Sequence, residues 1–495
     1  MNEIIKKIEE SQSKYLSSKK REYFKKNSQF FTPYDTAYKM ISTIDFCNFE
    51  NLTEIHILEP SAGCGILIAA LLINIFEKLP NINTFYIDLY ETDEDVVKIL
   101  KKNLSLLKKN ISNLNIKIKF RVINKNFIIG NKNRWAKNNS DKYDIIISNP
   151  PYKKINQSSP EAVIMNELVY GQPNIYTLFI AMSLKLLKNN GIYTVLSPRN
   201  YLTGEYSTLL RKFIFNNYSL TNIHSFKRGV LFPTVNQEVI ISTYSKSKRD
   251  TVNISFNGFD RFQVKFKDII LNGDSLSICI PKTLDDMKIL KAHSCLECHL
   301  NDLGFNLNVG PIVQFRNKEY LSQDMYSDST APLLIAPDIQ GNNTIIYKKR
   351  ENLRKTHNKS VLLDNRHLVK NHNYLLLRKV STKNDQTLIV CAVNHKDYFQ
   401  SEYLGFDNNL LYFYRLDNTS LSLEECYGLY CFINSSQFLS FYSIINGTHT
   451  INVTDFAKIR FPNYNTLTFL GKSILESANY TRENCTMLIK KYLKL

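Results

Sequence analysis

The chain has 495 residues, which is too long for one compact core and predicts at least two domains. Its 43% hydrophobic and 12% aromatic content excludes a disordered or fibrous protein. The 63 lysines and arginines exceed the 45 acidic residues, which gives a formal charge of +18 and indicates an anionic partner such as nucleic acid. A basic surface that is merely solvated is the alternative.

Neither the apolar runs nor the cysteines indicate a membrane or secreted protein. The best apolar run, residues 66–76, has about half the length of a membrane-spanning helix and includes Asn74. The first residues lack a signal-peptide core, and the nine cysteines are scattered and odd in number, so we expect a cytoplasmic protein without membrane contact. Cys295, Cys298 and His299 lie close together, but no second pair follows at zinc spacing, so we expect no metal.

In chain order, the predicted elements form three regions. Residues 1–29 are polar and basic and predict a helical arm that lies on a protein surface or on DNA. In residues 30–249, short β-branched runs alternate with helical segments, which is typical of a doubly wound α/β domain. Residues 250–495 predict a second domain of mixed α/β character, richer in short strands. In the middle region, expected strands cover residues 55–58, 84–90, 116–123, 143–147 and 192–196, and expected helices cover residues 66–79, 93–107 and 176–187.

A glycine loop follows the first expected strand. The segment Glu59-Pro60-Ser61-Ala62-Gly63-Cys64-Gly65 allows a tight turn and the close approach of a ligand. It lacks the Lys-Ser/Thr ending of a P-loop and the third glycine of the dinucleotide motif. Glu59 suits a cationic ligand such as the sulfonium and ammonium of S-adenosylmethionine. Glu91, at the end of the next strand, can accept both ribose hydroxyls of an adenosine. An ordinary strand-to-helix turn and a solvated glutamate are the alternatives.

The strongest signal is Asn149-Pro150-Pro151-Tyr152, which follows the buried strand expected at residues 143–147. The two prolines forbid continuation of the strand. The side-chain oxygen of Asn149 and the backbone carbonyl of Pro150 are two acceptors for the two N–H groups of a planar amino group. Tyr152 supplies a ring on which a base can stack. The alternative is a Pro-Pro loop without chemistry.

In this order, the motifs resemble those of the TaqI-type (gamma) class of N6-adenine DNA methyltransferases. The resemblance implies a Rossmann-like catalytic domain that uses S-adenosylmethionine. The family's Phe-Thr-Pro segment, here within residues 29–33, closes over the methionine end of the cofactor. The family usually has an Asp where this chain has Asn126, whose carbonyl can still accept the hydrogen bond of the cofactor's adenine amino group. The expected cofactor-binding residues are Thr32, Glu59, Pro60, Gly63, Gly65, Glu91, Asn126 and Phe127, and the expected catalytic residues are Asn149, Pro150, Pro151 and Tyr152.

The second half resembles the recognition domains of restriction–modification adenine methylases, notably the BsuBI/PstI-like group. The segments that carry this resemblance are residues 309–313, 409–415 and 446–455. Phe232 resembles the aromatic residue that packs against the target adenine opposite Tyr152; a core position is the alternative. Arg316, Arg378 and Arg415 are candidates for base readout.

The resemblance therefore predicts a site-specific methyltransferase that acts on N6 of an adenine flipped out of duplex DNA. It belongs to a restriction–modification system or works as a solitary methylase. We expect a monomer that binds double-stranded DNA, with a separate restriction endonuclease as a possible partner. Methylation of RNA or of a protein glutamine, and a non-catalytic DNA-binding role, are the alternatives.

Overall fold

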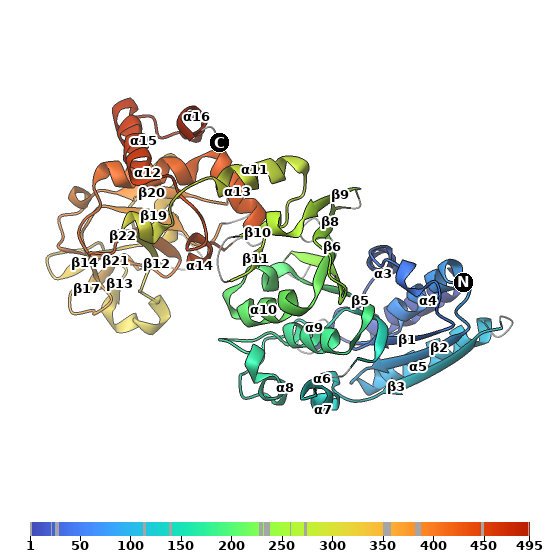
Figure 1. The fold of residues 1–495 in the computed structure, drawn as a ribbon. Coiled ribbons are helices and arrows are strands. Elements are labelled where there is room, and N and C mark those ends of the chain that lie inside the picture. Colours follow the sequence, from blue (N-terminus) through green and yellow to red (C-terminus); the bar gives the residue numbers. More distant parts are fainter. Residues whose placement is uncertain are drawn as a thin grey trace. The chain divides into compact units, whose positions relative to one another are not determined.

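The structure is a computed structural model, and its chain forms two compact units, residues 1–282 and residues 283–495. In Figure 1 the first unit runs from blue through green and the second from yellow-green to red. Among the described residues, no helix combines the length and the apolarity needed to cross a membrane. The structure describes residues 2–20, 22–24, 29–111, 115–137, 141–226, 231, 238–257, 259–271, 275–349, 358–381, 388–446, 450–493 and 495.

A nine-stranded sheet organises the first unit, in the order β3-β2-β1-β4-β5-β7-β6-β8-β9. Strands β3, β2, β1, β4 and β5 are parallel, and β7 pairs antiparallel with β5 and β6. Strand order reverses between β1 and β4, which is where a doubly wound sheet leaves room for ligands at its carboxyl edge. The bounds are β1 Glu54–Glu59, β2 Thr84–Tyr90, β3 Lys117–Ile123, β4 Tyr143–Ser148, β5 Leu187–Pro198, β6 Ser219–Ser225, β7 Val239–Ser245, β8 Thr251–Phe256 and β9 Phe259–Lys265, with the short β10 Ile270–Leu271 and β11 Ser277–Ile278.

The helices of the first unit cover this sheet. Helix α4 is buried along most of its length, in agreement with its apolar sequence. Helix α1 packs on the same core through Ile4, Ile5, Ile8 and Tyr15, so the basic arm carries an apolar stripe that its overall polarity conceals. The helices are α1 Asn2–Ser18, α3 Tyr34–Ser42, α4 Ile66–Lys78, α5 Glu94–Asn110, α6 Phe127–Gly130, α7 Lys132–Trp135, α8 Pro160–Ile164, α9 Ile175–Lys185 and α10 Thr208–Asn217.

Every strand and helix expected between residues 55 and 196 is present; β2 has the expected ends, and the ends of the others are shifted. The largest shift is in β5, which begins at Leu187 because this buried residue pairs with Tyr143 of β4. The polar residues 188–190 interrupt the register, and regular pairing resumes at Ile192. The first unit also extends to residue 282, beyond the boundary expected at residue 249. The reason is that β8 pairs with β6 and β9 with β8, so this segment continues the large sheet.

The second unit is of mixed α/β character, as expected. It contains sheets of order β12-β22-β19-β20, β13-β17-β14-β21-β18 and β15-β16. Its strands are β12 Phe305–Val309, β13 Leu321–Ser322, β14 Thr330–Leu334, β15 Ile339–Gln340, β16 Thr344–Ile345, β17 Ser360–Leu362, β18 Val369–Lys370, β19 Tyr374–Arg378, β20 Cys391–Asn394, β21 Tyr403–Phe406 and β22 Leu410–Arg415. Its helices are α11 Leu284–Ser294, α12 Leu423–Asn434, α13 Ser436–Ile445, α14 Val453–Phe456, α15 Tyr464–Ser477 and α16 Arg482–Leu493.

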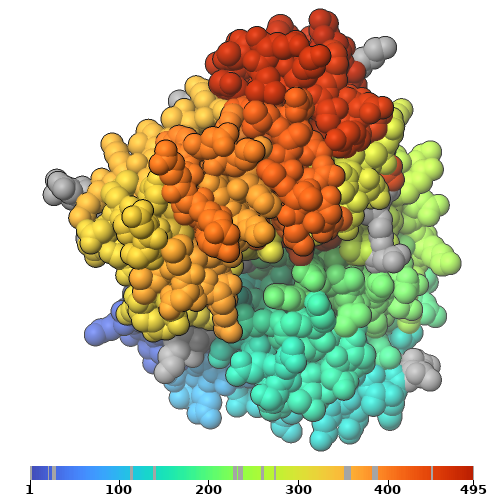
Figure 2. Space-filling view, turned by 90° about the vertical axis from the view of Figure 1, so that its left-hand side faces the viewer, coloured from blue at the N-terminus to red at the C-terminus, as the bar shows by residue number. Residues whose placement is uncertain are grey.

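Helices α12 and α15 approach each other unusually closely, and glycines at the crossing permit it. A β-carbon on Gly428 would lie 2.1 Å from the carbonyl oxygen of Leu467, and one on Gly471 would lie 1.8 Å from that of Glu424. Only glycine therefore fits at both positions. Helices α15 and α16, red in Figure 2, are in contact and lie side by side on the surface of the second unit.

Candidate active site

A cavity of about 540 Å³ lies at the carboxyl ends of β1, β2 and β4. It is the place that the reversal of strand order predicts for a ligand. Gly65 and Tyr152 are absent from its wall but bond to residues in it: the Gly65 N–H donates to Ala62, and the Tyr152 hydroxyl donates to Asn149. The other expected catalytic and cofactor-binding residues line the cavity: Thr32, Glu59, Pro60, Gly63, Glu91, Asn126, Phe127, Asn149, Pro150 and Pro151.

The glycine loop is tied to the ends of two neighbouring strands. Gly63 and Gly65 have φ angles of +51° and +88°, in the left-handed region that favours glycine. The Gly63 N–H donates to the Glu91 carboxylate at 3.0 Å, and the Ser61 hydroxyl donates to the Asn149 carbonyl at 2.9 Å. These two bonds fix the loop relative to the ends of β2 and β4.

Glu59 places a buried carboxyl group in the cavity wall. Its side chain is 1% exposed, and its Oε2 has no hydrogen-bond partner among the described residues. Burial, and next the charge of Glu91, raise the pKa of Glu59 well above its usual range. A buried carboxyl with an unused oxygen is suited to a cationic ligand group, because such a ligand supplies the missing partner.

The protein itself occupies most of the hydrogen-bonding capacity of the Glu91 carboxylate. Its carboxylate accepts backbone N–H groups of Gly63 at 3.0 Å, Thr92 at 2.7 Å and Asp93 at 2.9 Å. Burial raises the pKa of Glu91, although these three bonds act in the opposite direction. Three of about four acceptor positions are thus taken, which leaves room for one ribose hydroxyl rather than the two that were expected.

Asn126 uses its oxygen to cap helix α6. The oxygen accepts the N–H groups of Ile128 at 3.0 Å and Ile129 at 3.1 Å, and its amide donates to Glu161 at 2.8 Å. Both lone pairs of the oxygen are therefore occupied. The expected bond from an adenine amino group to this oxygen stays a prediction. Phe127 packs between Tyr90 and Phe179.

The Asn149 amide has three of its four hydrogen-bond positions filled. One N–H donates to the Phe30 carbonyl at 2.8 Å and the other to the Thr32 hydroxyl at 3.0 Å. The oxygen accepts from the Tyr152 hydroxyl at 2.8 Å, so one of its lone pairs stays unused among the described residues. The Pro150 carbonyl likewise accepts no hydrogen bond from any residue that the structure describes. Two adjacent residues thus each offer one open acceptor.

Tyr152 is held firmly beside these acceptors. Its hydroxyl hydrogen is shared between Asn149 and the Leu196 carbonyl, which lies 3.1 Å away. Its ring stacks on Phe30, with centroids 5.5 Å apart and planes 22° apart, and meets Tyr176 edge-on. Burial raises the pKa of the Tyr152 hydroxyl well above its usual range, so the group stays a neutral donor.

Asp93 secures the N-terminal segment beside the cavity, a role that was not expected from the sequence. One carboxylate oxygen accepts hydrogen bonds from Tyr15 at 2.8 Å, Tyr23 at 3.0 Å and Gln29 at 3.0 Å. The other oxygen caps helix α5. Although burial acts to raise it, these bonds hold the pKa of Asp93 below its usual value. The only sequence signal was an aspartate at the expected helix start, which reads as a cap alone.

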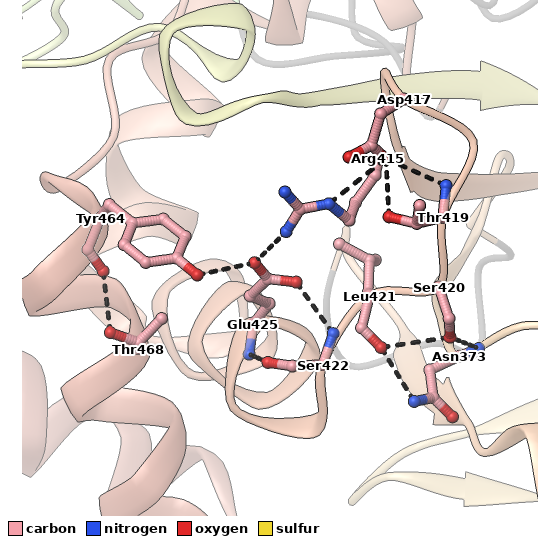
Figure 3. A network of polar contacts seen from close by, with 10 residues as sticks. All are labelled: Asn373, Arg415, Asp417, Thr419, Ser420, Leu421, Ser422, Glu425, Tyr464 and Thr468. Atoms are coloured by element: carbon pink, nitrogen blue, oxygen red, sulfur yellow. Dashed lines mark hydrogen bonds and ion pairs between the residues drawn. The ribbon is translucent and has the colours of Figure 1, made fainter.

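The expected DNA-contacting residues differ in their surroundings. Arg316 is exposed and packs on the ring of Phe315, whereas Arg378 donates to the Ile339 carbonyl at 2.7 Å. Arg415 forms an ion pair with the buried Glu425, as Figure 3 shows. Their contact with DNA stays a prediction.

Figure 3 also shows why Arg415 has a structural role. Glu425 is 1% exposed and accepts a hydrogen bond from the Tyr464 hydroxyl at 2.9 Å. Asp417 lies 3.5 Å from the Arg415 Nε. Arg415 therefore supplies the counter-charge that a buried glutamate requires.

Two other expectations concern the rest of the chain. Phe232, expected to stack on the target base, lies outside the described residues. Cys295 is exposed and its thiol donates to the Lys291 carbonyl, whereas the His299 ring contacts the Ile459 carbonyl. Within the described residues, no group of three or more His, Cys, Asp or Glu side chains is arranged to hold a metal ion.

Residues 66–232, which include β2, β4 and residues 149–152, match the Eco57I restriction-modification methylase family. This part of the chain is therefore similar to restriction–modification methylase domains. The sheet of the first unit has the doubly wound, Rossmann-like arrangement of strands.

Similarity to type II methyltransferases extends over most of the chain. M.BsuBI of Bacillus subtilis is 27% identical over 467 residues, which cover 91% of this chain and 90% of that protein. M.PstI of Providencia stuartii is 27% identical over 435 residues, which cover 84% of this chain and 83% of that protein. The type IIL restriction-modification enzyme MmeI, solved in complex with DNA, has a similar fold, with a TM-score of 0.55 and 11% identity over 95% of this chain and 73% of that one.

Asp93→Asn tests whether this carboxylate holds the N-terminal segment of the first unit. The substitution keeps an oxygen to cap α5 but removes the charged acceptor of Tyr15, Tyr23 and Gln29. We expect the free energy of local opening to fall by at least about 1 kcal/mol in α1 and residues 29–33. Hydrogen–deuterium exchange measures this opening.

The control for this experiment is Asp95→Asn, which removes the pairs of an exposed carboxylate with Lys19 and Lys98. It should leave exchange in residues 29–33 unchanged. Equal exchange in the two variants would show that Asp93 does not hold the segment.

Proposed function

We propose that this protein transfers the methyl group of S-adenosylmethionine to N6 of an adenine flipped out of duplex DNA, as the methylase of a restriction–modification system. The observation that carries the proposal is the pair of open acceptors on Asn149 and Pro150. An exocyclic amino group has two N–H donors to match them. When both are accepted, the nitrogen lone pair is drawn out of conjugation and becomes available to an electrophilic methyl group.

The cavity residues suit the proposed methyl donor. Glu59 has the buried, unused carboxyl oxygen that a cationic group requires, and Glu91 has room for one ribose hydroxyl. Phe127 belongs to an aromatic wall on which an adenine can pack. S-adenosylmethionine supplies a methyl group that is activated by the positive charge of its sulfur.

On this proposal, the chain's own residues orient the amino group and Tyr152 supports the base. Tyr152 is a rigid platform because Phe30, Tyr176 and the Leu196 carbonyl all restrain it. Extrusion of the base costs a few kcal/mol, which stacking and the two accepted hydrogen bonds offset. The amino proton leaves to solvent after transfer. Phe232 is proposed, from the resemblance alone, as a second stacking residue.

Several properties support DNA as the polymer and adenine as the base. The chain has a formal charge of +18, which favours a phosphate backbone. The relatives with similarity over most of the chain are named type II methyltransferases. The second unit is proposed as the target-recognition domain, with the exposed Arg316 as a DNA contact and a separate restriction endonuclease as partner. Adenine N6 follows from the resemblance of the catalytic segment and its order of motifs.

Asn149→Ala tests the proposed chemistry. We expect loss of methyl transfer to duplex DNA by about a hundredfold or more, since the amino group loses an acceptor that acts in the transition state. Binding of S-adenosylmethionine should persist. The measurement is incorporation of label from the methyl donor into DNA, RNA and protein offered separately.

The control is Asn110→Ala, which removes an exposed side chain of α5. Its activity should equal that of the unaltered protein. Label in RNA or protein but not in DNA would contradict the proposed substrate, and full activity of Asn149→Ala would remove this residue from its role.

The pH dependence of cofactor binding tests the role of Glu59. Its raised pKa means that the carboxyl is protonated at acid pH and becomes an anion only as pH rises through that pKa. We expect affinity for S-adenosylmethionine to rise with pH, by about tenfold per unit below that pKa, because a cation favours the ionised form. Titration calorimetry over a series of pH values measures this change. Glu59→Gln should bind weakly and without this pH dependence; a flat profile in the unaltered protein would contradict the role.

A further inference from the structure

We propose that Thr32, with the backbone carbonyl of Phe30, is a positioning residue that sets the orientation of the catalytic amide of Asn149. The inference rests on the proposed function, since it concerns how Asn149 presents its oxygen to the amino group. The resemblance places Thr32 beside the cofactor instead. The contacts of its hydroxyl give it a role in catalysis.

The orientation of the Asn149 amide follows from the chemistry of its neighbours. A carbonyl oxygen can only accept, so the atom of Asn149 that lies 2.8 Å from the Phe30 carbonyl must be the amide nitrogen. The second N–H of that nitrogen points at the Thr32 hydroxyl, 3.0 Å away. With both donors turned toward the N-terminal segment, the oxygen faces Tyr152 and keeps one lone pair open.

This orientation decides whether the amino group can be held. The nitrogen and oxygen of an asparagine amide are nearly equal in size, so only hydrogen bonds choose between the two orientations. In the reversed orientation, the amide nitrogen would face the N–H groups of the amino group, and two donors would oppose each other. The cost of that arrangement is the desolvation of unmatched polar groups.

The N-terminal segment is anchored well enough to impose the orientation. The Thr32 side chain is 6% exposed, and its carbonyl accepts a hydrogen bond from Gln12 of α1 at 3.3 Å. Gln29, three residues earlier, is held by Asp93. Both ends of the short stretch that contacts Asn149 are thus tied to the first unit. The same stretch lines the cofactor cavity, so it joins the cofactor site to the catalytic amide.

Thr32→Val and Thr32→Ser test the proposal in the full-length protein. Valine removes the hydroxyl that accepts the Asn149 N–H, whereas serine retains it. We expect Thr32→Val to lower the single-turnover rate of DNA methylation by about tenfold or more and to change the dissociation constant of S-adenosylmethionine by less than about twofold. Thr32→Ser should recover most of the rate.

The control is Thr36→Val, which removes the hydroxyl of another buried threonine in the adjacent helix α3. It should leave the methylation rate unchanged. Loss of cofactor affinity without loss of rate in Thr32→Val would overturn the proposal and support a cofactor contact. An unchanged rate would also overturn it.

A second measurement separates this proposal from the proposed function. In protein with ¹⁵N-labelled asparagine, the side-chain signal of Asn149 is identified by its loss in Asn149→Ala. We expect slow hydrogen exchange of this amide in the unaltered protein and in Thr32→Ser, and exchange faster by about tenfold in Thr32→Val. This readout needs no activity, so it holds even if DNA is not the substrate. Equal exchange in all three proteins would contradict the positioning role.

Discussion

The hydrogen-bonding capacity of one side chain, Asn149, constrains the rest of the active site. Three of its four positions are filled by the protein, which leaves a single lone pair directed to a ligand. The following residue, Pro150, has no N–H, and its carbonyl is open among the described residues. Both residues directly follow strand β4, and every residue of β4 is buried. The strand therefore holds them in place. The site thus pairs a fixed backbone acceptor with a side-chain acceptor whose orientation must be maintained.

If the protein has the proposed function, its cofactor binding and its catalysis share one structural element. The stretch from Gln29 to Thr32 lines the cavity, bonds to Asn149 and is held by Asp93. Asp93 in turn donates its backbone N–H to Glu91, which accepts the Gly63 N–H of the glycine loop. A continuous set of hydrogen bonds therefore joins the ends of β1, β2 and β4. Displacement of the whole N-terminal segment is expected to affect both ligands of the site, whereas loss of the Thr32 hydroxyl alone is expected to affect only methyl transfer.

Most of the first unit could be predicted from sequence because its elements are long and periodic, and because Asn149-Pro150-Pro151-Tyr152 is distinctive on its own. What could not be predicted were partners far apart in the chain. Thr32 and Asn149 are 117 residues apart, and their bond depends on tertiary packing. The bond of Asn126 to Glu161 was hidden for the same reason. Its capping of α6 is local and was missed because the resemblance assigned its oxygen to the cofactor. The polar composition of α1 concealed its apolar stripe, and the polar residues 188–190 concealed the pairing of Leu187 with Tyr143.

The most direct test of the account is the identity of the methylated base. After reaction of duplex DNA with labelled S-adenosylmethionine, the DNA is digested to nucleosides and the labelled product is identified by chromatography and mass spectrometry. The account predicts N6-methyl-2′-deoxyadenosine, because the open acceptors of Asn149 and Pro150 match the two N–H groups of that amino group and the order of motifs indicates adenine. Label in N4-methyl-2′-deoxycytidine, or in a ring carbon of cytosine, would contradict it.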